Sequence, residues 1–189
     1  GLMNKKDMEY ILKNFNGIVI VDEAYIDFAE AASFIGLIKQ YNNLIVSQTF
    51  SKAWGLAAVR VGLAYANDQI ISYYNSVKPP YNVSELNQNA VIEALDNQRR
   101  YQENLTTIIS EKKQFRAALQ ELDIVKKIHP SDANFFLIEV DNADELYNAL
   151  IDQQIITRNR NKQIKNCLRI TIGSPEENQE LIKALKKLA

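Results

Sequence analysis

The sequence has few of the residues that build disulfide frameworks or metal centres, and it has no long apolar run. Its 189 residues include one cysteine, Cys167, and one histidine, His129. A single cysteine excludes an internal disulfide and is typical of a reducing cytoplasm. A lone histidine without neighbouring ligands predicts no metal site. No apolar run approaches the ~20 residues of a membrane-spanning helix, so we expect a cytoplasmic protein with no membrane partner.

Charge of one sign is not in excess either. The chain has 22 lysine and arginine residues against 23 aspartate and glutamate residues, a net charge of −1. This balance, without a basic stripe, does not favour a nucleic-acid partner. Apolar residues make up 47% of the chain and charged residues 24%, which is ordinary for a globular protein with a real core. The length allows one large domain, or one domain and part of another.

The first third of the chain has the pattern of a βαβ unit. Apolar spacing predicts a helix over residues 5–14, with Asn4 as its N-cap. The β-branched run at 17–21 predicts a strand buried on both faces. The pattern of 30–41 predicts an amphipathic helix, and a second strand begins at Leu44. The link to a strand at 60–66 is too short for a helical crossover, so we expect that strand to be antiparallel.

The rest of the chain predicts helices and then a small α+β lobe. Helices are expected over 68–77 and 84–95, followed by a long charged helix over 97–121 that connects two lobes. Strands are then expected at 124–128, 135–140, 155–158 and 167–172. Helices are expected at 144–153 and after Ser174, where serine, proline and glutamate have the order of a capping box. The fold class predicted is therefore α/β followed by α+β.

The stretch from Ser47 to Gly62 carries the strongest chemical signal. Lys52 lies among small and apolar residues, surroundings that disfavour its charged form. A neutral amine is what imine chemistry with an aldehyde requires. The alternative is an exposed lysine on a turn, the usual position of lysine. Nearby residues are donors suited to an anion such as phosphate: Ser47, Thr49, Ser51 and Arg60.

Asp22 follows the first predicted strand and should lie on the same rim of the sheet as Lys52. Open α/β sheets bind ligands at the carboxyl ends of their strands. A carboxylate there would keep an aromatic nitrogen protonated, and Tyr25 would hydrogen-bond a phenolate oxygen of the same ring. The alternative is that Asp22 and Tyr25 only cap the following turn.

Two arginines of the second lobe are candidate anion clamps. Alternation in the strand 167–172 puts Arg169 and Thr171 on one face and aliphatic residues on the other. If that face lines a cleft, Arg169 binds a carboxylate or a phosphate; if it faces water, Arg169 is a solvated edge residue. For Arg158 the pattern favours the solvated position. Cys167 is expected to be a buried small hydrophobe.

Several of these residues also form motifs of a known family. The motifs are Asp22-Glu23-Ala24-Tyr25, Ser51-Lys52 with Gly55-Leu56-Ala57, Arg60-Val61-Gly62, and the segments 78–84, 132–135 and 167–178. Together they resemble the fold-type I aminotransferases that depend on pyridoxal phosphate, and among them the histidinol-phosphate aminotransferase family. The resemblance covers essentially the whole chain.

The resemblance implies a role for each matching residue. Lys52 would bind pyridoxal 5'-phosphate covalently and shuttle a proton on the substrate. Asp22 would pair with the pyridine nitrogen and Tyr25 with the ring 3'-oxygen. The cofactor phosphate would be bound by Thr49, Ser51 and Arg60. Arg169 would hold the anionic group of the substrates, with Arg158 as a second clamp.

The resemblance also implies domains, reaction and partners. Residues 1–96 would be part of the cofactor-binding large domain, 97–121 an interdomain helix and 122–189 a small C-terminal α+β domain. The reaction would transfer an amino group from L-histidinol phosphate to 2-oxoglutarate in histidine biosynthesis, giving L-glutamate, in a cytoplasmic homodimer. Family members are longer, so we expect a C-terminal portion that is inactive alone. A threonine-phosphate decarboxylase and a non-catalytic binding domain remain alternatives.

Overall fold

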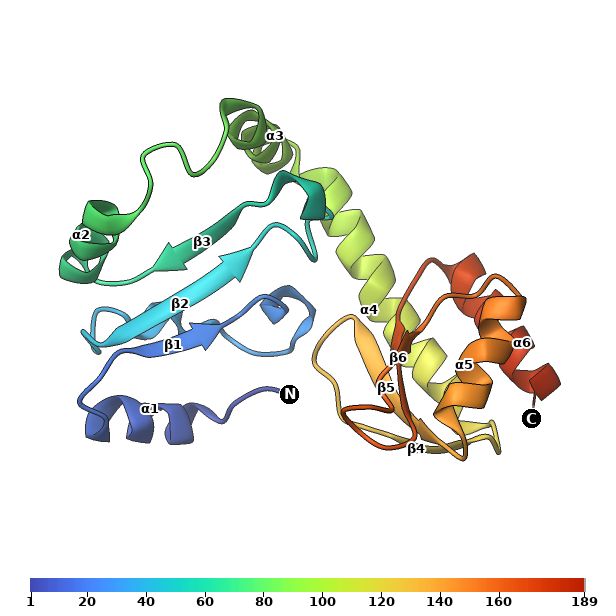
Figure 1. The fold of residues 1–189 in the computed structure, drawn as a ribbon. Helices are drawn as coiled ribbons and strands as arrows, with labels where there is room; N and C mark the ends of the chain where they lie inside the picture. Colours follow the sequence, from blue (N-terminus) through green and yellow to red (C-terminus); the bar gives the residue numbers. More distant parts are fainter. Residues whose placement is uncertain (189) are drawn as a thin grey trace. The chain divides into compact units, whose positions relative to one another are not determined.

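The chain divides into two compact units. The computed structural model describes residues 1–188. Residues 2–103 form the N-terminal unit, and the described residues from Asn104 onward, together with Gly1, form the C-terminal unit. Helix α4 (Gln98–Gln120) crosses the boundary between them (Figure 1). Each unit has its own sheet and its own apolar cluster, so each is described by itself.

The N-terminal unit contains a three-stranded sheet in the order β1-β2-β3 (Figure 1). Its strands are β1 (Val19–Asp22), β2 (Leu44–Thr49) and β3 (Gly62–Tyr65). β1 and β2 are parallel, and β3 runs antiparallel to β2, as predicted. The Cα of Asp22 is opposite that of Ser47, and the Cα of Thr49 is opposite that of Gly62. The carboxyl ends of β1 and β2 therefore reach the same rim of the sheet.

One face of this sheet is covered and the other is open. Helix α1 (Lys5–Asn14) begins as predicted, with the Asn4 side chain accepting from Lys6 N, and it buries Met8 and Leu12 against the sheet. On the other face, Ile20 is 66% exposed. The prediction that the first strand is buried on both faces is therefore wrong, because no element of residues 1–188 covers that side.

The connection between β1 and β2 contains no α-helix. The 3-10 turn η1 (Ile26–Phe28) follows β1, and in place of the predicted helix over 30–41 there is the 3-10 turn η2 (Phe34–Leu37). Glu23, directly after β1, is 6% exposed and accepts from Ser33 Oγ at 2.6 Å and from Phe34 N at 2.7 Å. This carboxylate anchors the start of the segment at the end of the sheet. The amphipathic spacing was correct in identifying a buried side, but the long-range anchor set the conformation.

Helices follow β3 at the predicted positions. α2 (Asp68–Val77) begins after Asn67, whose side chain accepts from Ile70 N at 2.9 Å. α3 (Glu85–Asp96) begins after Ser84, whose hydroxyl accepts from Asn87 N at 3.3 Å. Both caps use the side-chain types that satisfy the free N–H groups of a first helical turn.

The C-terminal unit is an antiparallel sheet with helices packed against one face. Its strand order is β4-β5-β7-β6, with β4 (Val125–Ile128), β5 (Phe135–Val140), β6 (Arg158–Asn159) and β7 (Cys167–Thr171). α5 (Ala143–Asp152), α6 (Pro175–Leu188) and the end of α4 pack on Phe136, Ile138 and Ile170. β6 begins where the predicted strand 155–158 was expected to end. The predicted α/β fold class is confirmed.

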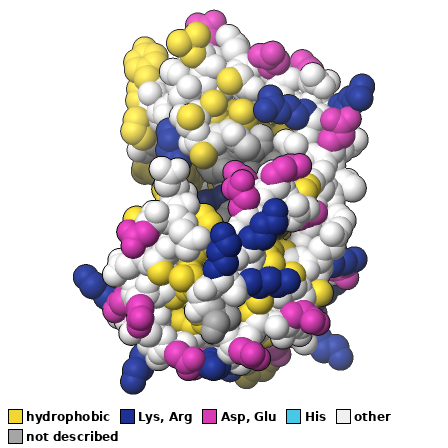
Figure 2. Space-filling view, turned by 90° about the vertical axis from the view of Figure 1, so that its right-hand side faces the viewer, with side chains coloured by type: hydrophobic (Ala, Val, Ile, Leu, Met, Phe, Trp, Pro, Cys, Tyr) yellow, Lys and Arg dark blue, Asp and Glu magenta, His cyan; other side chains and the backbone are white. Residues whose placement is uncertain are grey.

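Two further observations concern the surface charges and the apolar character of the helices. On the face that Figure 2 presents, basic and acidic side chains are interspersed. Within residues 1–188, no helix has both the length and the apolar character needed to cross a membrane.

Candidate active site

Asp22 is the last residue of β1 and lies on the sheet rim. Its Oδ1 accepts a hydrogen bond from Ala24 N at 3.0 Å and one from Ser47 Oγ at 3.5 Å. The first bond caps the turn after β1, and the second reaches across to β2. No partner within residues 1–188 occupies Oδ2, so this oxygen can accept from a ligand.

Lys52 lies on a tight turn after β2. Gly55 N donates to Lys52 O and Leu56 N donates to Phe50 O, both at 2.9 Å, and the φ of +70° at Gly55 favours glycine. Phe50 and Ala53 are buried, but the Lys52 side chain is exposed. The burial expected from its apolar neighbours is therefore absent, and two of those neighbours, Ala57 and Ala58, are themselves exposed.

The turn brings Lys52 close to Tyr25. The Lys52 Nζ lies 5.2 Å from the centroid of the Tyr25 ring, within the range of a cation–π contact. Tyr25 also contacts Phe28, with ring centroids 6.5 Å apart. The structure thus joins two of the residues that the sequence singled out, although they lie on different connections.

Three predicted anion donors lie at the end of β2 and the start of β3. Thr49 Oγ1 donates to Ser51 Oγ at 3.0 Å and accepts from Ser51 N at 3.1 Å. Ser51 Oγ therefore accepts one bond and keeps its own proton to donate. Arg60 has a left-handed backbone (φ 54°), and its exposed guanidinium donates to Ala57 O at 3.1 Å. Its neighbour Val61 accepts from Phe50 N, so Arg60 lies next to the Lys52 turn.

Sequence reasoning missed the buried carboxylate Glu23. Besides Ser33 and Phe34, it accepts from Gln48 Nε2 at 2.9 Å. Gln48 belongs to β2, so Glu23 holds the turn after β1 against the neighbouring strand. A signal existed in the sequence, since two acidic residues directly follow a β-branched run, but only Asp22 was interpreted.

Sequence reasoning also missed a cluster of two aromatic rings and a carboxylate. The Trp54 ring stacks on the Tyr101 ring at a centroid distance of 4.0 Å and an angle of 13°. Tyr101 Oη donates to Asp27 Oδ1 at 2.7 Å. Partial burial and the adjacent Asp27 carboxylate raise the pKa of the Tyr101 phenol well above its usual value. Trp54 therefore packs against Tyr101 of α4.

The two arginines of the C-terminal unit are cross-strand neighbours. Arg158 and Arg169 are opposite each other on β6 and β7, so their side chains leave the same face of the sheet. The Arg169 guanidinium lies 5.0 Å from the centroid of the Phe135 ring, and its buried Nε has no hydrogen-bond partner within residues 1–188. Like charges directly opposite are unfavourable, and an unsatisfied buried donor is costly. The Arg158 side chain is exposed, so solvent screens its repulsion from Arg169.

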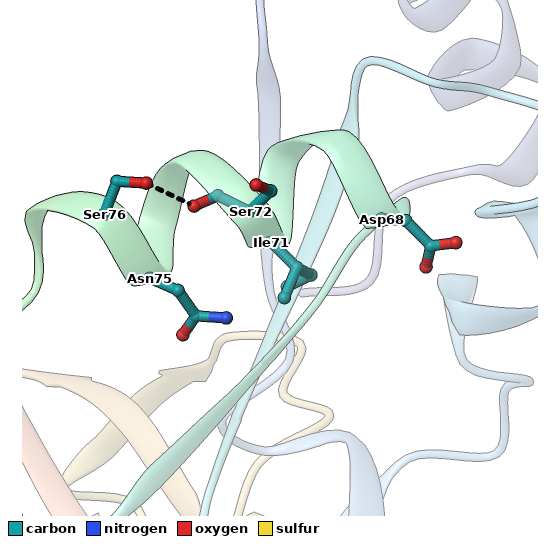
Figure 3. A pocket seen from close by; sticks show the side chains of 5 residues that line it. All are labelled: Asp68, Ile71, Ser72, Asn75 and Ser76. Carbon is teal, nitrogen blue, oxygen red and sulfur yellow. Dashed lines mark hydrogen bonds between the residues drawn. The ribbon is translucent and has the colours of Figure 1, made fainter.

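Two other features do not belong to the candidate site. Cys167 is 1% exposed, as predicted, and burial raises the pKa of its thiol; its Sγ is 4.0 Å from His129 Nε2. A shallow concavity lies along α2 (Figure 3), lined by Asp68, Ile71, Ser72, Asn75 and Ser76. All five of these residues come from one helix and none from the rim of the sheet.

The amino-acid sequence matches a known protein family and curated relatives. A family model described as aminotransferase class I and II matches residues 1–185. The histidinol-phosphate aminotransferase of Flavobacterium johnsoniae is 46% identical over 180 residues, which is 94% of this chain and 52% of that protein. The chain thus spans about half the length of the curated relatives it matches.

Solved structures of related proteins have the same fold over this chain. The histidinol-phosphate aminotransferase from Clostridium acetobutylicum has a TM-score of 0.91 at 27% identity, covering 100% of this chain and 60% of that one. The L-threonine-O-3-phosphate decarboxylase from Porphyromonas gingivalis has a TM-score of 0.86 at 25% identity, covering 99% of this chain and 60% of that one.

Proposed function

The chain belongs to the aminotransferase class I and II family, and we propose that the protein containing it transfers an amino group from L-histidinol phosphate to 2-oxoglutarate, with pyridoxal 5'-phosphate as cofactor. The products are imidazole-acetol phosphate and L-glutamate. The observation that carries the proposal is the high identity to a histidinol-phosphate aminotransferase across nearly the whole chain. We extend the proposal to a cytoplasmic homodimer, which rests on the family resemblance.

The residues on the rim fit the cofactor. When bound, pyridoxal phosphate supplies an aldehyde and an electron-withdrawing ring that stabilises negative charge at the substrate Cα. The unpartnered Oδ2 of Asp22 suits a protonated ring nitrogen. The Ser51 hydroxyl proton and the Arg60 guanidinium suit a phosphate, and Thr49, whose own hydroxyl donates to Ser51 Oγ, would join them by turning that proton to the ligand. The donors and the acceptor thus match a ligand that carries a ring cation and a phosphate.

Lys52 is the residue to which we assign the chemistry. Its Nζ is the nucleophile for the aldehyde and the base that removes the proton from the substrate Cα. Tyr25, whose ring centroid lies 5.2 Å from Lys52 Nζ, orients the same ligand through its hydroxyl. Exposure of Lys52 in the chain as described is compatible with this role, because a bound ligand would itself exclude water from the amine.

Arg158 and Arg169 are proposed to bind an anionic group of the substrate. Their side chains leave one face of the C-terminal sheet. The Nε–H of Arg169 has no acceptor among residues 1–188, so it can donate to an anion. Both proposed substrates carry such a group, the phosphate of histidinol phosphate and a carboxylate of 2-oxoglutarate. A planar guanidinium binds either in bidentate geometry.

A decarboxylase of L-threonine phosphate is the second candidate function. The specific observation in its favour is the high TM-score to the Porphyromonas gingivalis decarboxylase. Its substrate shares an amine and a phosphate with histidinol phosphate, so the same lysine and arginines would serve it. A domain that keeps this scaffold without catalysis is an alternative of another class, and the joint presence of Asp22, Tyr25, Lys52 and Arg60 argues against it.

Product analysis separates these functions. The complete protein is incubated with pyridoxal phosphate and 2-oxoglutarate, and with either L-histidinol phosphate or L-threonine phosphate. We expect L-glutamate to form with histidinol phosphate and no carbon dioxide to be released from threonine phosphate. Carbon dioxide without glutamate would establish the decarboxylase instead. The absence of both products would favour the non-catalytic domain.

A further inference from the structure

Tyr101 contacts both of the turns that carry the proposed catalytic residues. It lies in the first turns of α4, 74 positions from Asp27 in the sequence, and its hydroxyl donates to Asp27 Oδ1 at 2.7 Å. Its ring stacks on Trp54 with a centroid distance of 4.0 Å. One side chain therefore joins the connection after β1 to the connection after β2.

Each turn links the contact with Tyr101 to a proposed site residue. In the first turn, Ile26 N donates to Glu23 O at 3.0 Å and Phe28 N to Tyr25 O at 3.1 Å, so Tyr25 and Asp27 share one hydrogen-bonded turn. In the second, Lys52 and Trp54 lie on the turn that the Gly55 N to Lys52 O bond closes. A shift of Asp27 or Trp54 would consequently move Tyr25 or Lys52.

Backbone pairing does not extend to these two turns. The β1–β2 register ends at Asp22 and Ser47, with one further bond from Glu23 N to Ser47 O at 2.8 Å. Beyond that bond the chains leave the ladder, and their separation depends on side chains. We propose that Tyr101 is a positioning residue that fixes the Lys52 turn relative to the Tyr25 turn, through Asp27 and Trp54. This inference rests on the function proposed for Lys52.

The chemistry of the contact suits a fixed link. A hydrogen bond to a carboxylate is stronger than one between neutral groups, and stacked aromatic rings restrict sliding. The raised pKa of Tyr101 keeps its phenol protonated, so it remains a donor through neutral and moderately alkaline pH. Proton transfer at a substrate carbon tolerates little misplacement, and an error of about 1 Å costs on the order of 100-fold in rate.

Two substitutions of Tyr101 separate its two contacts. Tyr101→Phe keeps the ring on Trp54 and removes the bond to Asp27, whereas Tyr101→Leu removes both. Tyr10→Leu is the matched control, because Tyr10 is 69% exposed on α1. Hydrogen exchange is measured by mass spectrometry on the complete protein, in peptides covering residues 23–28 and 50–56. Peptides of α2 and β3, which belong to the same unit as Tyr101, report on whether that unit stays folded.

The proposal predicts a distinct pattern for each variant. In Tyr101→Phe, exchange rises about tenfold in 23–28 and stays unchanged in 50–56, as loss of one bond to a charged group implies. In Tyr101→Leu, exchange rises in both peptides while those of α2 and β3 are unaffected. Unchanged exchange in 23–28 for Tyr101→Phe overturns the proposal. This holds even if Tyr101→Leu fails to fold.

A second measurement ties the link to Lys52. Each variant is treated with pyridoxal phosphate, reduced with borohydride and digested, and the modified fraction of Lys52 is followed over time. We expect Tyr101→Leu to slow modification about 10-fold to 100-fold, with Tyr101→Phe in between and Tyr10→Leu unchanged. Equal rates in all variants would overturn the positioning role. If Lys52 is unmodified in the unsubstituted protein, the proposed function fails, while the exchange measurement still decides whether Tyr101 holds the two turns.

Discussion

The two units bury their apolar side chains to different extents. In the C-terminal unit, strands β5 and β7 and helices α4, α5 and α6 close around one continuous core that includes Phe136, Ile138 and Leu150. Among its described residues, the large apolar side chains that stay exposed are Ile151, Ile156 and Ile164. Most of the exposed large apolar side chains belong to the N-terminal unit instead, among them Ile20 on the open face of the sheet and Val77, Tyr81 and Leu86 around α2 and α3.

The proposed site residues of the two units are carried by sheets with differently sized apolar cores. The C-terminal unit has one continuous apolar core, and the two arginines proposed to bind a substrate anion lie on the sheet face opposite the helices. The N-terminal unit carries the rim with Asp22 and Lys52 above a smaller core of Met8, Leu12 and Leu44. Its turns are held by polar and aromatic links such as Glu23 and Tyr101 rather than by a thick apolar layer.

Removing the amine on the rim should have the largest effect. In the complete protein, Lys52→Ala is expected to lower the proposed transamination by about 10⁴-fold or more, because it deletes both nucleophile and base. Lys183→Ala, an exposed lysine on α6 of the C-terminal unit, is the control and should leave the rate unchanged. Glutamate formation is the measurement. Substantial activity in the Lys52 variant would contradict the assignment of the nucleophile and base to the N-terminal unit.

Truncating an isoleucine in each unit tests the comparison of the cores. Ile138→Ala should lower the free energy of unfolding by about 2–5 kcal/mol, because Ile138 is fully buried and a cavity would remain. Ile20→Ala should change it by less than about 0.5 kcal/mol, because Ile20 is mostly exposed. Urea unfolding followed by circular dichroism gives both values. A large loss for Ile20→Ala would mean that its face of the sheet is covered in solution.

Glu23 tests whether polar links hold the N-terminal unit. Glu23→Ala leaves donors from Ser33, Phe34 and Gln48 without their acceptor, so the free energy of unfolding should fall by about 1–3 kcal/mol. Glu30→Ala removes an exposed carboxylate from the same connection and should change it by less than about 0.5 kcal/mol. The same urea titration measures both, and equal losses would contradict the anchoring role.

Alkaline pH should weaken the N-terminal unit through Tyr101. Its pKa is raised in the folded chain, so above about pH 10 the unfolded chain releases this proton while the folded chain keeps it. Stability should therefore fall as pH rises above that value. Tyr101→Phe should make the dependence shallower, and Tyr10→Phe should leave it unchanged. Thermal unfolding across that pH range tests this, and identical slopes in all three proteins would refute it.

In the C-terminal unit, Asp144 should contribute a small loss of stability at acidic pH. Hydrogen bonds from Asn159 and then Asn161 lower the pKa of Asp144. Because the pKa is depressed in the folded chain, the stabilisation is present above the unfolded value of about 4 and is lost as pH falls through the folded value. Asp144→Asn should reduce this part of the acid dependence slightly. Acid titrations of both proteins, monitored by circular dichroism, measure it.

The sequence by itself determined most of the local elements and the rim of the sheet on which Asp22 and Lys52 lie. Helix starts at Asn4, Ser84 and Ser174 were predictable because capping depends on residues within one turn, as the bond from Glu177 N to Ser174 Oγ illustrates. Strand order placed Asp22 and Lys52 at one rim because the carboxyl ends of neighbouring parallel strands meet there.

Only the tertiary structure decided what depends on contacts between distant residues. The segment anchored by the buried Glu23 forms the 3-10 turn η2 where a helix was predicted. Ile20 lies exposed on the open face of the sheet, and the Lys52 side chain is exposed although its sequence neighbours are apolar. The bond between Tyr101 and Asp27 joins residues 74 positions apart. Periodicity reports which side of an element is apolar; it does not report which partner, if any, covers that side.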